Sequence, residues 1–337
     1  MHIIRNTAAR LTAPAILVRL AAAFLLATTL SGATRPATAA PAPAKPTPTK
    51  TAPSPQADFA SADDAAQALV AALTAGDEAK LRDILGPGSE KLIHSGDDVA
   101  DREARDRFVE AYTAKHQLVP GDGGTTVVQV GDNDWPLPIP LVSANGRWRF
   151  DTATAGQEIV DRRIGRNEIA AIGVLFALVD AEKDYFARAT AGAGQYAQHI
   201  VSDPGKHDGL YWDAADGEDP SPLAKLVEKA AEEGYPSEPV KGHREPYQGY
   251  YFRILKAQGN YATEGARAYI KDGRMTGGLA FIAWPAEYGA SGITTFMVNQ
   301  DRIVFQKDLG PNTEARVSTF TKFDPDLTWA RVDVVDR

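Results

Sequence analysis

The sequence contains no cysteine. Disulfide bonds therefore cannot stabilise the fold, and the stability has to come from a packed apolar core. Lipid attachment through an N-terminal cysteine is excluded for the same reason. About 280 residues remain beyond the N-terminal segments described below, which is enough for a substantial core in one or two domains.

Motifs of several common enzyme classes are also missing. The sequence has no His-Glu-x-x-His zinc motif, no phosphate-binding P-loop and no dinucleotide-binding fingerprint. Ser291 lies in Gly-Ala-Ser-Gly, without the Gly-x-Ser-x-Gly pattern that exposes a nucleophile, and we interpret it as a turn residue. These absences weaken the case for an enzyme but leave the question open.

The N-terminal segment has the pattern of a secretory signal peptide. Residues 1–40 contain four arginines and no acidic residue, and the apolar run 20–30 is followed by small-residue cleavage sites. This run is too short to cross a bilayer, which needs roughly 20 residues. We expect a periplasmic or secreted protein whose mature chain does not insert into a membrane.

The segment that follows is rich in proline, and the rest of the chain is acidic. Residues 36–57 hold seven of the 22 prolines, so we expect a disordered, proline-rich linker over residues 41–57.

Without the four arginines of residues 1–40, 32 basic residues remain against 44 acidic ones, a net charge near −12. Such a surface repels phosphate groups, so nucleic acid and anionic membranes are not expected partners.

The hydrophobic pattern predicts an α+β fold in which helices pack on small antiparallel sheets in two subdomains, residues 58–155 and 156–337. In the first, Ser61 is expected to cap a helix, and a second helix carries Leu81, Ile84 and Leu85. The further elements expected there are a helix over 101–118 and strands over 125–130, 137–143 and 147–151.

The second subdomain is expected to begin with a long helix over 162–190, followed by a shorter helix over 222–233. Four strands then form an antiparallel sheet that packs on the long helix. They are predicted over 250–257, 279–284, 293–298 and 303–309.

Several strings resemble a bacterial family labelled only as domain of unknown function 2950. They are WPLPIPLV (135–142), GRWRFDT (146–152), RRIGRNE (162–168), the YW of GLYW (209–212), PYQGYYFRIL (246–255), GGLAFIAWPAEYG (277–289) and SGITTFMVNQ (291–300). The resemblance covers nearly all of residues 58–330. It implies a secreted bacterial protein and assigns no catalytic residues.

Each half has a partial likeness of its own. The segment AAQALVAALTAGDEAKLRDIL with the later NGRWRFD looks like the nuclear transport factor two-like fold, a cone of helices on a curved sheet. The second half, with AEKDYFARATAGAGQYAQ, YYFRIL and RIVFQKDLG, is similar to the headgroup of type IV pilins and pseudopilins. In those proteins the helix begins the chain, whereas here it is internal, which puts filament assembly in doubt.

A Gly- and Asp-rich loop holds one group of candidate ligand-binding residues. His207 beside Asp208 could act as an oriented base, with Tyr211 and Trp212 close by. The carboxylates that follow could supply oxygen ligands to calcium, the one cofactor considered, although no cofactor is predicted. The alternative is an ordinary solvated turn. These carboxylates are Asp213, Asp216, Glu218 and Asp219.

Arginines at the start of the long helix form a second candidate group. Arg162, Arg163 and Arg166 could clamp a carboxylate or phosphate, or could instead form ordinary ion pairs with nearby acidic residues. Trp135 opens a stretch with proline at alternate positions, which suits either a groove for a partner or a boundary strand that packs its own tryptophan.

Two hypotheses for function follow. The first is a non-enzymatic interaction or structural protein of the cell envelope, with an envelope protein or small molecule as partner. The alternative is a hydrolase or small-ligand binder that uses a pocket in the first domain or the cleft between the domains. A deep cavity with at least two convergent polar side chains of shifted pKa would favour the alternative.

Overall fold

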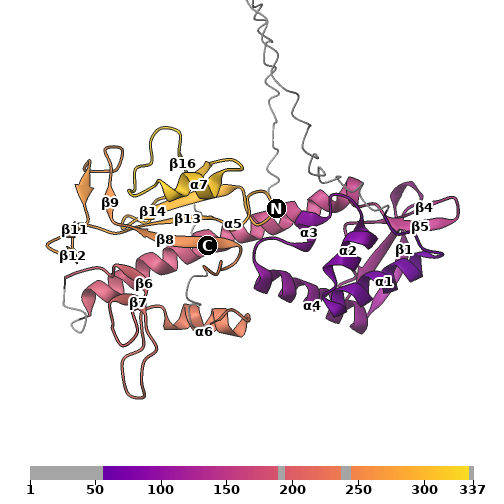
Figure 1. Cartoon of the computed structure of the whole chain (residues 1–337), viewed down its shortest axis with the longest axis horizontal. Helices are drawn as coiled ribbons and strands as arrows, with labels where there is room; N and C mark the ends of the chain where they lie inside the picture. The colour runs from indigo at the N-terminus through magenta and orange to yellow at the C-terminus, as the bar shows by residue number, and fades with distance from the viewer. Residues whose placement is uncertain (1–55, 189–193, 237–243, 334–337) are drawn as a thin grey trace, which may run out of the picture. The chain divides into compact units, whose positions relative to one another are not determined.

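Two five-stranded antiparallel sheets, each with helices against it, organise the chain (Figure 1). The computed structural model describes residues 56–188, 194–236 and 244–333, which belong to one compact unit. The predicted α+β class is confirmed. The predicted leader over residues 1–40 and all but the last two residues of the predicted linker lie outside the described residues.

The first sheet has the strand order β1-β2-β4-β5, and β3 pairs with β2. Four helices precede it in the chain. The elements are α1 (Ala62–Ala75), α2 (Glu78–Leu85), α3 (Glu90–Ile93), α4 (Asp98–Ala114), β1 (His116–Pro120), the 3-10 turn η1 (Asp122–Gly124), β2 (Thr126–Val130), β3 (Trp135–Pro136), β4 (Leu141–Ala144) and β5 (Arg147–Phe150).

Local sequence explains the two leading helices. The Ser61 hydroxyl accepts a hydrogen bond from the Asp64 backbone N–H at 3.0 Å, so the predicted N-cap of α1 is confirmed. Gly76 ends α1 in the left-handed conformation that glycine adopts most easily (φ 62°). Leu81, Ile84 and Leu85 of α2 are buried in the first core, as their spacing predicts.

Two boundaries in this half differ from the prediction. The helix expected over 101–118 ends at Ala114. Residues His116–Pro120 form β1 instead, because their backbone groups pair with β2 and not within a helix. The strand expected over 137–143 begins only at Leu141. Pro138 and Pro140 have no N–H to donate to a neighbouring strand, so the ladder is interrupted before that point.

The second half begins with α5 (Thr152–Ala187), which starts ten residues before the predicted position. The predicted boundary between residues 155 and 156 therefore lies inside this helix. The further elements are β6 (His199–Val201), β7 (Gly209–Tyr211), α6 (Ala224–Glu232), β8 (Tyr250–Leu255), β9 (Ala257–Gln258), β10 (Arg267–Ala268), β11 (Ile270–Lys271), β12 (Arg274–Met275), β13 (Ala280–Pro285), β14 (Thr294–Asn299), β15 (Val304–Asp308), α7 (Thr313–Ser318) and β16 (Ala330–Arg331).

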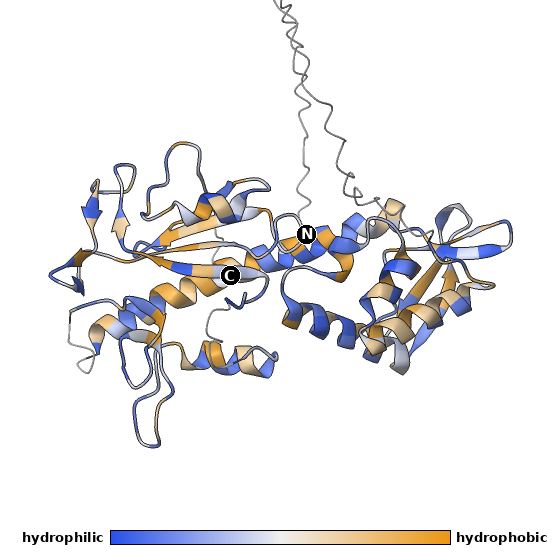
Figure 2. Cartoon of the chain, in the orientation of Figure 1, coloured by the Kyte–Doolittle hydropathy of each residue, from blue (hydrophilic) through white to orange (hydrophobic). Residues whose placement is uncertain are grey.

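The second sheet has the order β16-β15-β14-β13-β8 with antiparallel pairing throughout, which confirms the four predicted strands. Strand β13, between β14 and β8, is buried along its whole length, and α5 packs against it with Leu175 and Leu178. Figure 2 shows the apolar residues concentrated in these strands. None of the described helices combines the length and apolar character that crossing a membrane requires.

One carboxyl group is enclosed in this second core. Glu182 of α5 is fully buried, and its Oε2 accepts a hydrogen bond from the Ala197 backbone N–H at 2.8 Å. Its Oε1 has no hydrogen-bond partner among the described residues. Burial raises the pKa of Glu182 to about 8, against the lowering effect of the Ala197 hydrogen bond.

This burial predicts a pH-dependent stability. The folded chain keeps the Glu182 proton up to about pH 8, whereas the unfolded chain releases it near the ordinary pKa of 4.5. The folded state thus binds more protons in this interval, so the free energy of unfolding falls as pH rises through it, by at most about 1.4 kcal/mol per pH unit. Glu182→Gln should remove this slope in urea unfolding followed by circular dichroism.

The matched control is Glu228→Gln, which changes an exposed glutamate of α6 and should keep the wild-type slope. Equal pH dependence in wild type and Glu182→Gln would show that Glu182 ionises normally.

Candidate functional site

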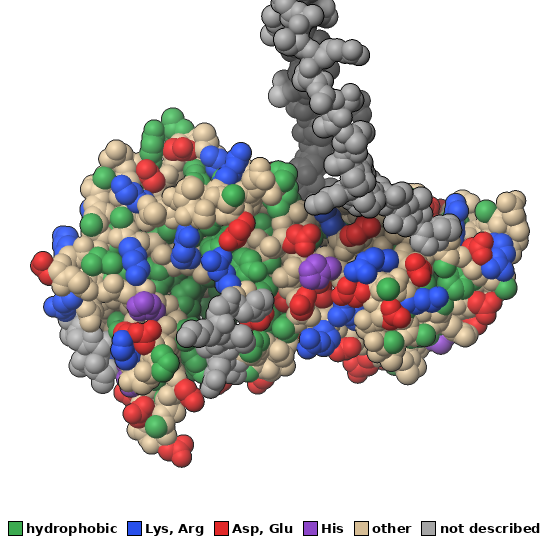
Figure 3. All heavy atoms as spheres, viewed as in Figure 1, with side chains coloured by type: hydrophobic (Ala, Val, Ile, Leu, Met, Phe, Trp, Pro, Cys, Tyr) green, Lys and Arg blue, Asp and Glu red, His purple; other side chains and the backbone are tan. Residues whose placement is uncertain are grey.

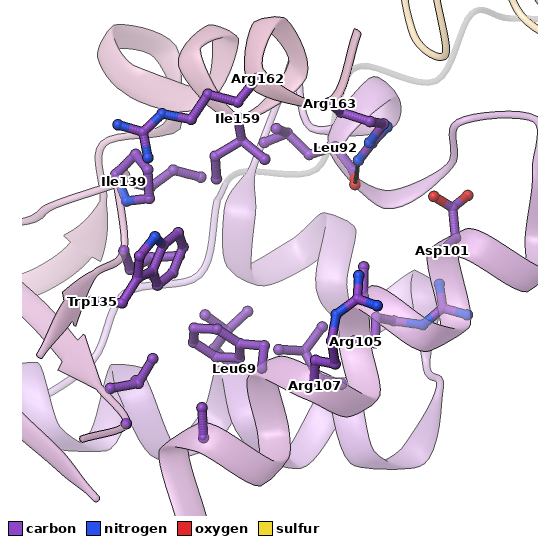
Figure 4. A pocket seen from close by; sticks show the side chains of 18 of the residues that line it. Leu69, Leu92, Asp101, Arg105, Arg107, Trp135, Ile139, Ile159, Arg162 and Arg163 are labelled. Carbon is purple, nitrogen blue, oxygen red and sulfur yellow. Dashed lines mark hydrogen bonds between the residues drawn. The ribbon is translucent and has the colours of Figure 1, made fainter. Parts of the chain in front are cut away.

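A cavity of about 660 Å³ opens in the first half of the chain. Its wall combines residues of α1, α2, α3, α4 and α5 with the segment around β3. Figure 4 shows Arg162 and Ile159 of α5 on one side, Trp135 on a second, and Leu69, Arg105 and Arg107 facing them across the open space. The volume lies within the range of about 300–1,000 Å³ typical of small-molecule sites.

The floor of the cavity is apolar. It reaches into the first hydrophobic core, so the same side chains that stabilise the helices also form the lining. The apolar lining residues are Leu69, Leu73, Leu81, Leu85, Leu92, Ile93, Ala104, Phe108, Ala111, Val130, Leu137, Pro138, Ile139 and Ile159. A floor of this kind favours the apolar part of a ligand through the hydrophobic effect.

Five arginines and two aspartates supply the charged side chains of the lining. Arg105 and Arg107 belong to α4, and the sequence-predicted Arg162, Arg163 and Arg166 belong to α5. Asp101 and Asp132 are the acidic members. The cavity is therefore locally positive in a chain whose net charge is −8, and this favours an anionic ligand.

Three of these arginines have partners within the protein. Arg107 pairs with Glu103 and Arg162 with Glu158, in both cases one turn away on the same helix. The Arg163 guanidinium donates hydrogen bonds to the backbone carbonyls of Lys91 and Leu92, both at 2.8 Å. Arg163 thus satisfies carbonyls at the end of α3 and ties α3 to α5.

Arg105 and Arg166 have no hydrogen bond or ion pair with any other described residue. The pKa of Arg166 is lowered by partial desolvation and by the positive charges of Arg107 and Arg162. Burial likewise lowers the pKa of Arg163. Arg107 and Arg162 have glutamate partners, whereas Arg166 has no acidic partner within the described part of the chain, and a bound anion would supply one.

Trp135 lies at the rim of this cavity. Its side chain is 41% exposed, and its ring meets that of Phe108 edge-on with 6.5 Å between the centroids. Of the two interpretations drawn from the sequence, the groove therefore fits the position of the ring better than a tryptophan packed into its own strand. An exposed aromatic ring beside arginines offers further apolar contact to a ligand.

The other predicted group lies apart from the cavity lining. His207 stacks on the ring of Trp212 at 4.4 Å, and its backbone carbonyl accepts a hydrogen bond from the Tyr185 hydroxyl at 2.8 Å. Asp208 accepts a hydrogen bond from the Asp203 backbone N–H, and Tyr211 ends β7. The structure therefore does not bring His207 and Asp208 together with the arginines of α5.

The carboxylates proposed for calcium are exposed and do not form a cluster of metal ligands. Glu218 accepts a hydrogen bond from the Ala215 backbone N–H at 3.2 Å, as in an ordinary turn. Within the described residues, three metal-type ligands meet instead at His94, Asp98 and Asp101. The exposed carboxylates are Asp213, Asp216, Glu218 and Asp219.

Sequence reasoning missed part of this site. It identified Arg162, Arg163, Arg166 and Trp135, but not the arginines of α4. The usable signal was the presence of Arg105 and Arg107 on a predicted helix that has few apolar residues. It also missed His94 with Asp98, because the non-helical residues between α3 and α4 bring them together and no local periodicity predicts that connection.

Comparison with known proteins gives one match. The family model described as protein of unknown function (DUF2950) matches residues 56–332, which confirms the family resemblance seen in the sequence. No curated protein and no solved structure matches the chain. The likeness of the two halves to the nuclear transport factor two-like fold and to pilin headgroups therefore stays a prediction.

The arginine geometry predicts opposite effects of two substitutions on stability. Arg163→Gln loses two charge-assisted hydrogen bonds to backbone carbonyls and should lower the free energy of unfolding by about 1.5–3 kcal/mol. Arg166→Gln loses no such bond and relieves repulsion, so stability should stay equal or rise. Urea unfolding of both variants measures the difference, and equal losses would contradict the assignment of their roles.

Proposed function

The chain belongs to the family described as protein of unknown function (DUF2950), and we propose that it binds a small amphipathic anion in the cavity of its first half. The observation that carries this proposal is an apolar cavity whose lining includes two arginines, Arg105 and Arg166, that pair with no other residue in the described part of the chain. The apolar part of the ligand would occupy the floor around Leu69 and Ile139. Its anionic group would face Arg105 and Arg166.

Arginine suits this task because its planar guanidinium donates two parallel hydrogen bonds to a carboxylate or phosphate. Arg105 is half-buried, which limits the competition from water, whereas Arg166 remains exposed near the mouth. On binding, neither would have to give up a hydrogen bond or ion pair to a residue of the ranges 56–188, 194–236 and 244–333. A carboxylate or phosphate that carries one acyl chain has the required chemistry.

Binding is favoured over hydrolysis by the composition of the wall. A hydrolytic site needs a nucleophile or an activated water next to a base. The cavity lining includes no histidine, serine, threonine or tyrosine, and its polar members are arginines, Asp101, Asp132 and Asn133. The proposal thus takes the ligand-binding form of the alternative drawn from the sequence and keeps the non-enzymatic character of the leading hypothesis.

We also propose that the protein binds its ligand outside the cytoplasm. The arginine-containing, acid-free segment 1–40 supports export. A periplasmic or secreted binding protein would meet amphipathic anions released from the cell envelope. The acidic surface away from the cavity would discourage non-specific binding to anionic membranes.

The test compares an anionic with a neutral ligand of the same chain length. We expect dodecanoate, kept below its critical micelle concentration, to bind in a one-to-one complex in isothermal titration calorimetry, and dodecanol to bind more weakly. Arg105→Gln and Arg166→Gln should each weaken dodecanoate binding about tenfold, which corresponds to one charge-assisted hydrogen bond of about 1.4 kcal/mol.

The matched control is Arg102→Gln, because Arg102 lies on the same helix as Arg105 but does not line this cavity. Its affinity for dodecanoate should equal that of the wild type, and all variants should bind dodecanol alike. Equal binding of dodecanoate and dodecanol by the wild type, or no binding of either, would refute the proposal.

A further inference from the structure

A second group of polar side chains lies where α3 meets α4. His94 follows the last residue of α3, Asp98 is the first residue of α4, and Asp101 lies one turn further on. The His94 Nδ1 atom is 3.4 Å from Asp98 Oδ1 and 3.9 Å from Asp101 Oδ2. One ligand atom from each of the three side chains lies within 4.8 Å of the other two.

These separations fit the donors around a small metal ion. Tetrahedral Zn²⁺, with bonds of about 2.1 Å to nitrogen and oxygen, places neighbouring donors about 3.4 Å apart. One imidazole nitrogen and two carboxylates form a donor set typical of Zn²⁺ and similar first-row ions. Calcium and magnesium prefer all-oxygen sites, so the histidine argues against them.

The burial of Asp101 is an independent reason to expect a cation. Asp101 is only 6% exposed, and the hydrogen bond that its side chain accepts comes from the Ser95 backbone N–H at 2.7 Å. Within the described part of the chain, no lysine or arginine lies at ion-pair distance from it. Arg163 is close enough to interact with its charge, but donates its hydrogen bonds to two backbone carbonyls. A buried carboxylate needs hydrogen bonds or a cation to replace its lost hydration; Asp97 has three hydrogen bonds, whereas Asp101 has the single one from Ser95 among the described residues.

The backbone that carries Asp98 and Asp101 is fixed at the start of α4. Asp97, next to them, is buried and fixes the start of α4: its Oδ1 accepts a hydrogen bond from the Ala100 N–H at 3.0 Å, and its Oδ2 accepts from the Tyr235 hydroxyl at 2.8 Å. The first turn of a helix also favours negative charge, so this position suits the two carboxylates.

The site is open on one side. A hollow of about 540 Å³ lies over the three ligands, and its other lining residues are Glu78, Glu90, Glu287, Arg82, Arg102 and Arg105. Figure 3 shows acidic and basic side chains interspersed over this part of the surface. Three protein ligands with room for water or another group are typical of open zinc sites, whereas structural zinc sites have four protein ligands.

We propose that His94, Asp98 and Asp101 bind one divalent first-row transition-metal ion. This site does not depend on the proposed function, although Asp101 and Arg105 line both the hollow and the cavity, so the two adjoin. An ion held there would add positive charge beside Arg105. It would strengthen the binding of an anionic group in the cavity without being required for it.

The test uses Zn²⁺ alone and the full chain without a histidine tag. Isothermal titration calorimetry near neutral pH should give one Zn²⁺ per chain with micromolar or tighter affinity, and saturating Zn²⁺ should raise the melting temperature. His94→Ala and Asp98→Asn should each weaken binding at least about tenfold and remove the rise in melting temperature. Both residues are substantially exposed, so folding should be retained, as far-UV circular dichroism can confirm.

Two control variants are matched to these. His207→Ala changes a histidine that is 4.0 Å from a single carboxylate, Glu218, and Asp106→Asn changes an exposed acid of α4; both should bind Zn²⁺ like the wild type. The proposal is overturned if the wild type takes up no stoichiometric Zn²⁺, or if His94→Ala and Asp98→Asn bind it unchanged. Dodecanoate titration of the zinc-free chain tests the cavity separately.

Discussion

The packing of α5 against the second sheet fixes the positions of three of the five arginines in the cavity. Residues 171–185 of the helix bury Leu175, Leu178 and their neighbours against β13 and β14. Nearer its start, the same helix contributes Ile159 to the first core. Because the backbone between these stretches is one continuous helix, the Cα positions of residues 162, 163 and 166 are set by both cores. The helix thus fixes where these arginine side chains begin along the cavity wall.

The buried Asp97 connects the start of α4 to the segment before β8 by hydrogen bonds. Asp97 Oδ2 accepts from the Gly249 backbone N–H at 2.7 Å as well as from the Tyr235 hydroxyl, and burial raises the pKa of Asp97. Gly249 has a φ of 78°, and a Cβ atom there would lie 2.3 Å from Asn167 Nδ2. Only glycine can occupy this position, because any Cβ atom would clash with Asn167 and the backbone has a positive φ. The segment before β8 therefore lies against both α4 and α5. The cap of α4 and the position of α5 are therefore coupled.

Much of the fold was predictable where local chemistry decides it. The Ser61 cap, the buried face of α2 and the strands of the second sheet follow from side-chain patterns within a few residues. β1 was missed because its ladder depends on β2, a partner about ten residues away that local periodicity does not reveal. The early start of α5 was missed because Thr152 and the residues after it give little apolar periodicity.

The candidate site was predictable only in part, because it also depends on contacts between residues far apart in the sequence. Arginines that are close in sequence, such as Arg162 and Arg166, can be identified as a group. Their convergence with Arg105 depends on how α4 packs beside α5, and the cavity between them is a property of tertiary packing. The sequence also made His207 a candidate, but its ring stacks on Trp212 in a separate loop. Spacing identifies reactive residue types, whereas the fold decides which of them meet.

The central claim is that the cavity holds an apolar chain whose anionic end faces the arginines. A crystal structure of the chain with 12-bromododecanoate tests it most directly, since bromine is located by its anomalous scattering. We expect the bromine among Leu69, Leu81 and Ile139, and the carboxylate within hydrogen-bond distance of Arg105 or Arg166. Bromine at the mouth with the carboxylate inside, or a ligand bound elsewhere on the chain, would contradict the account.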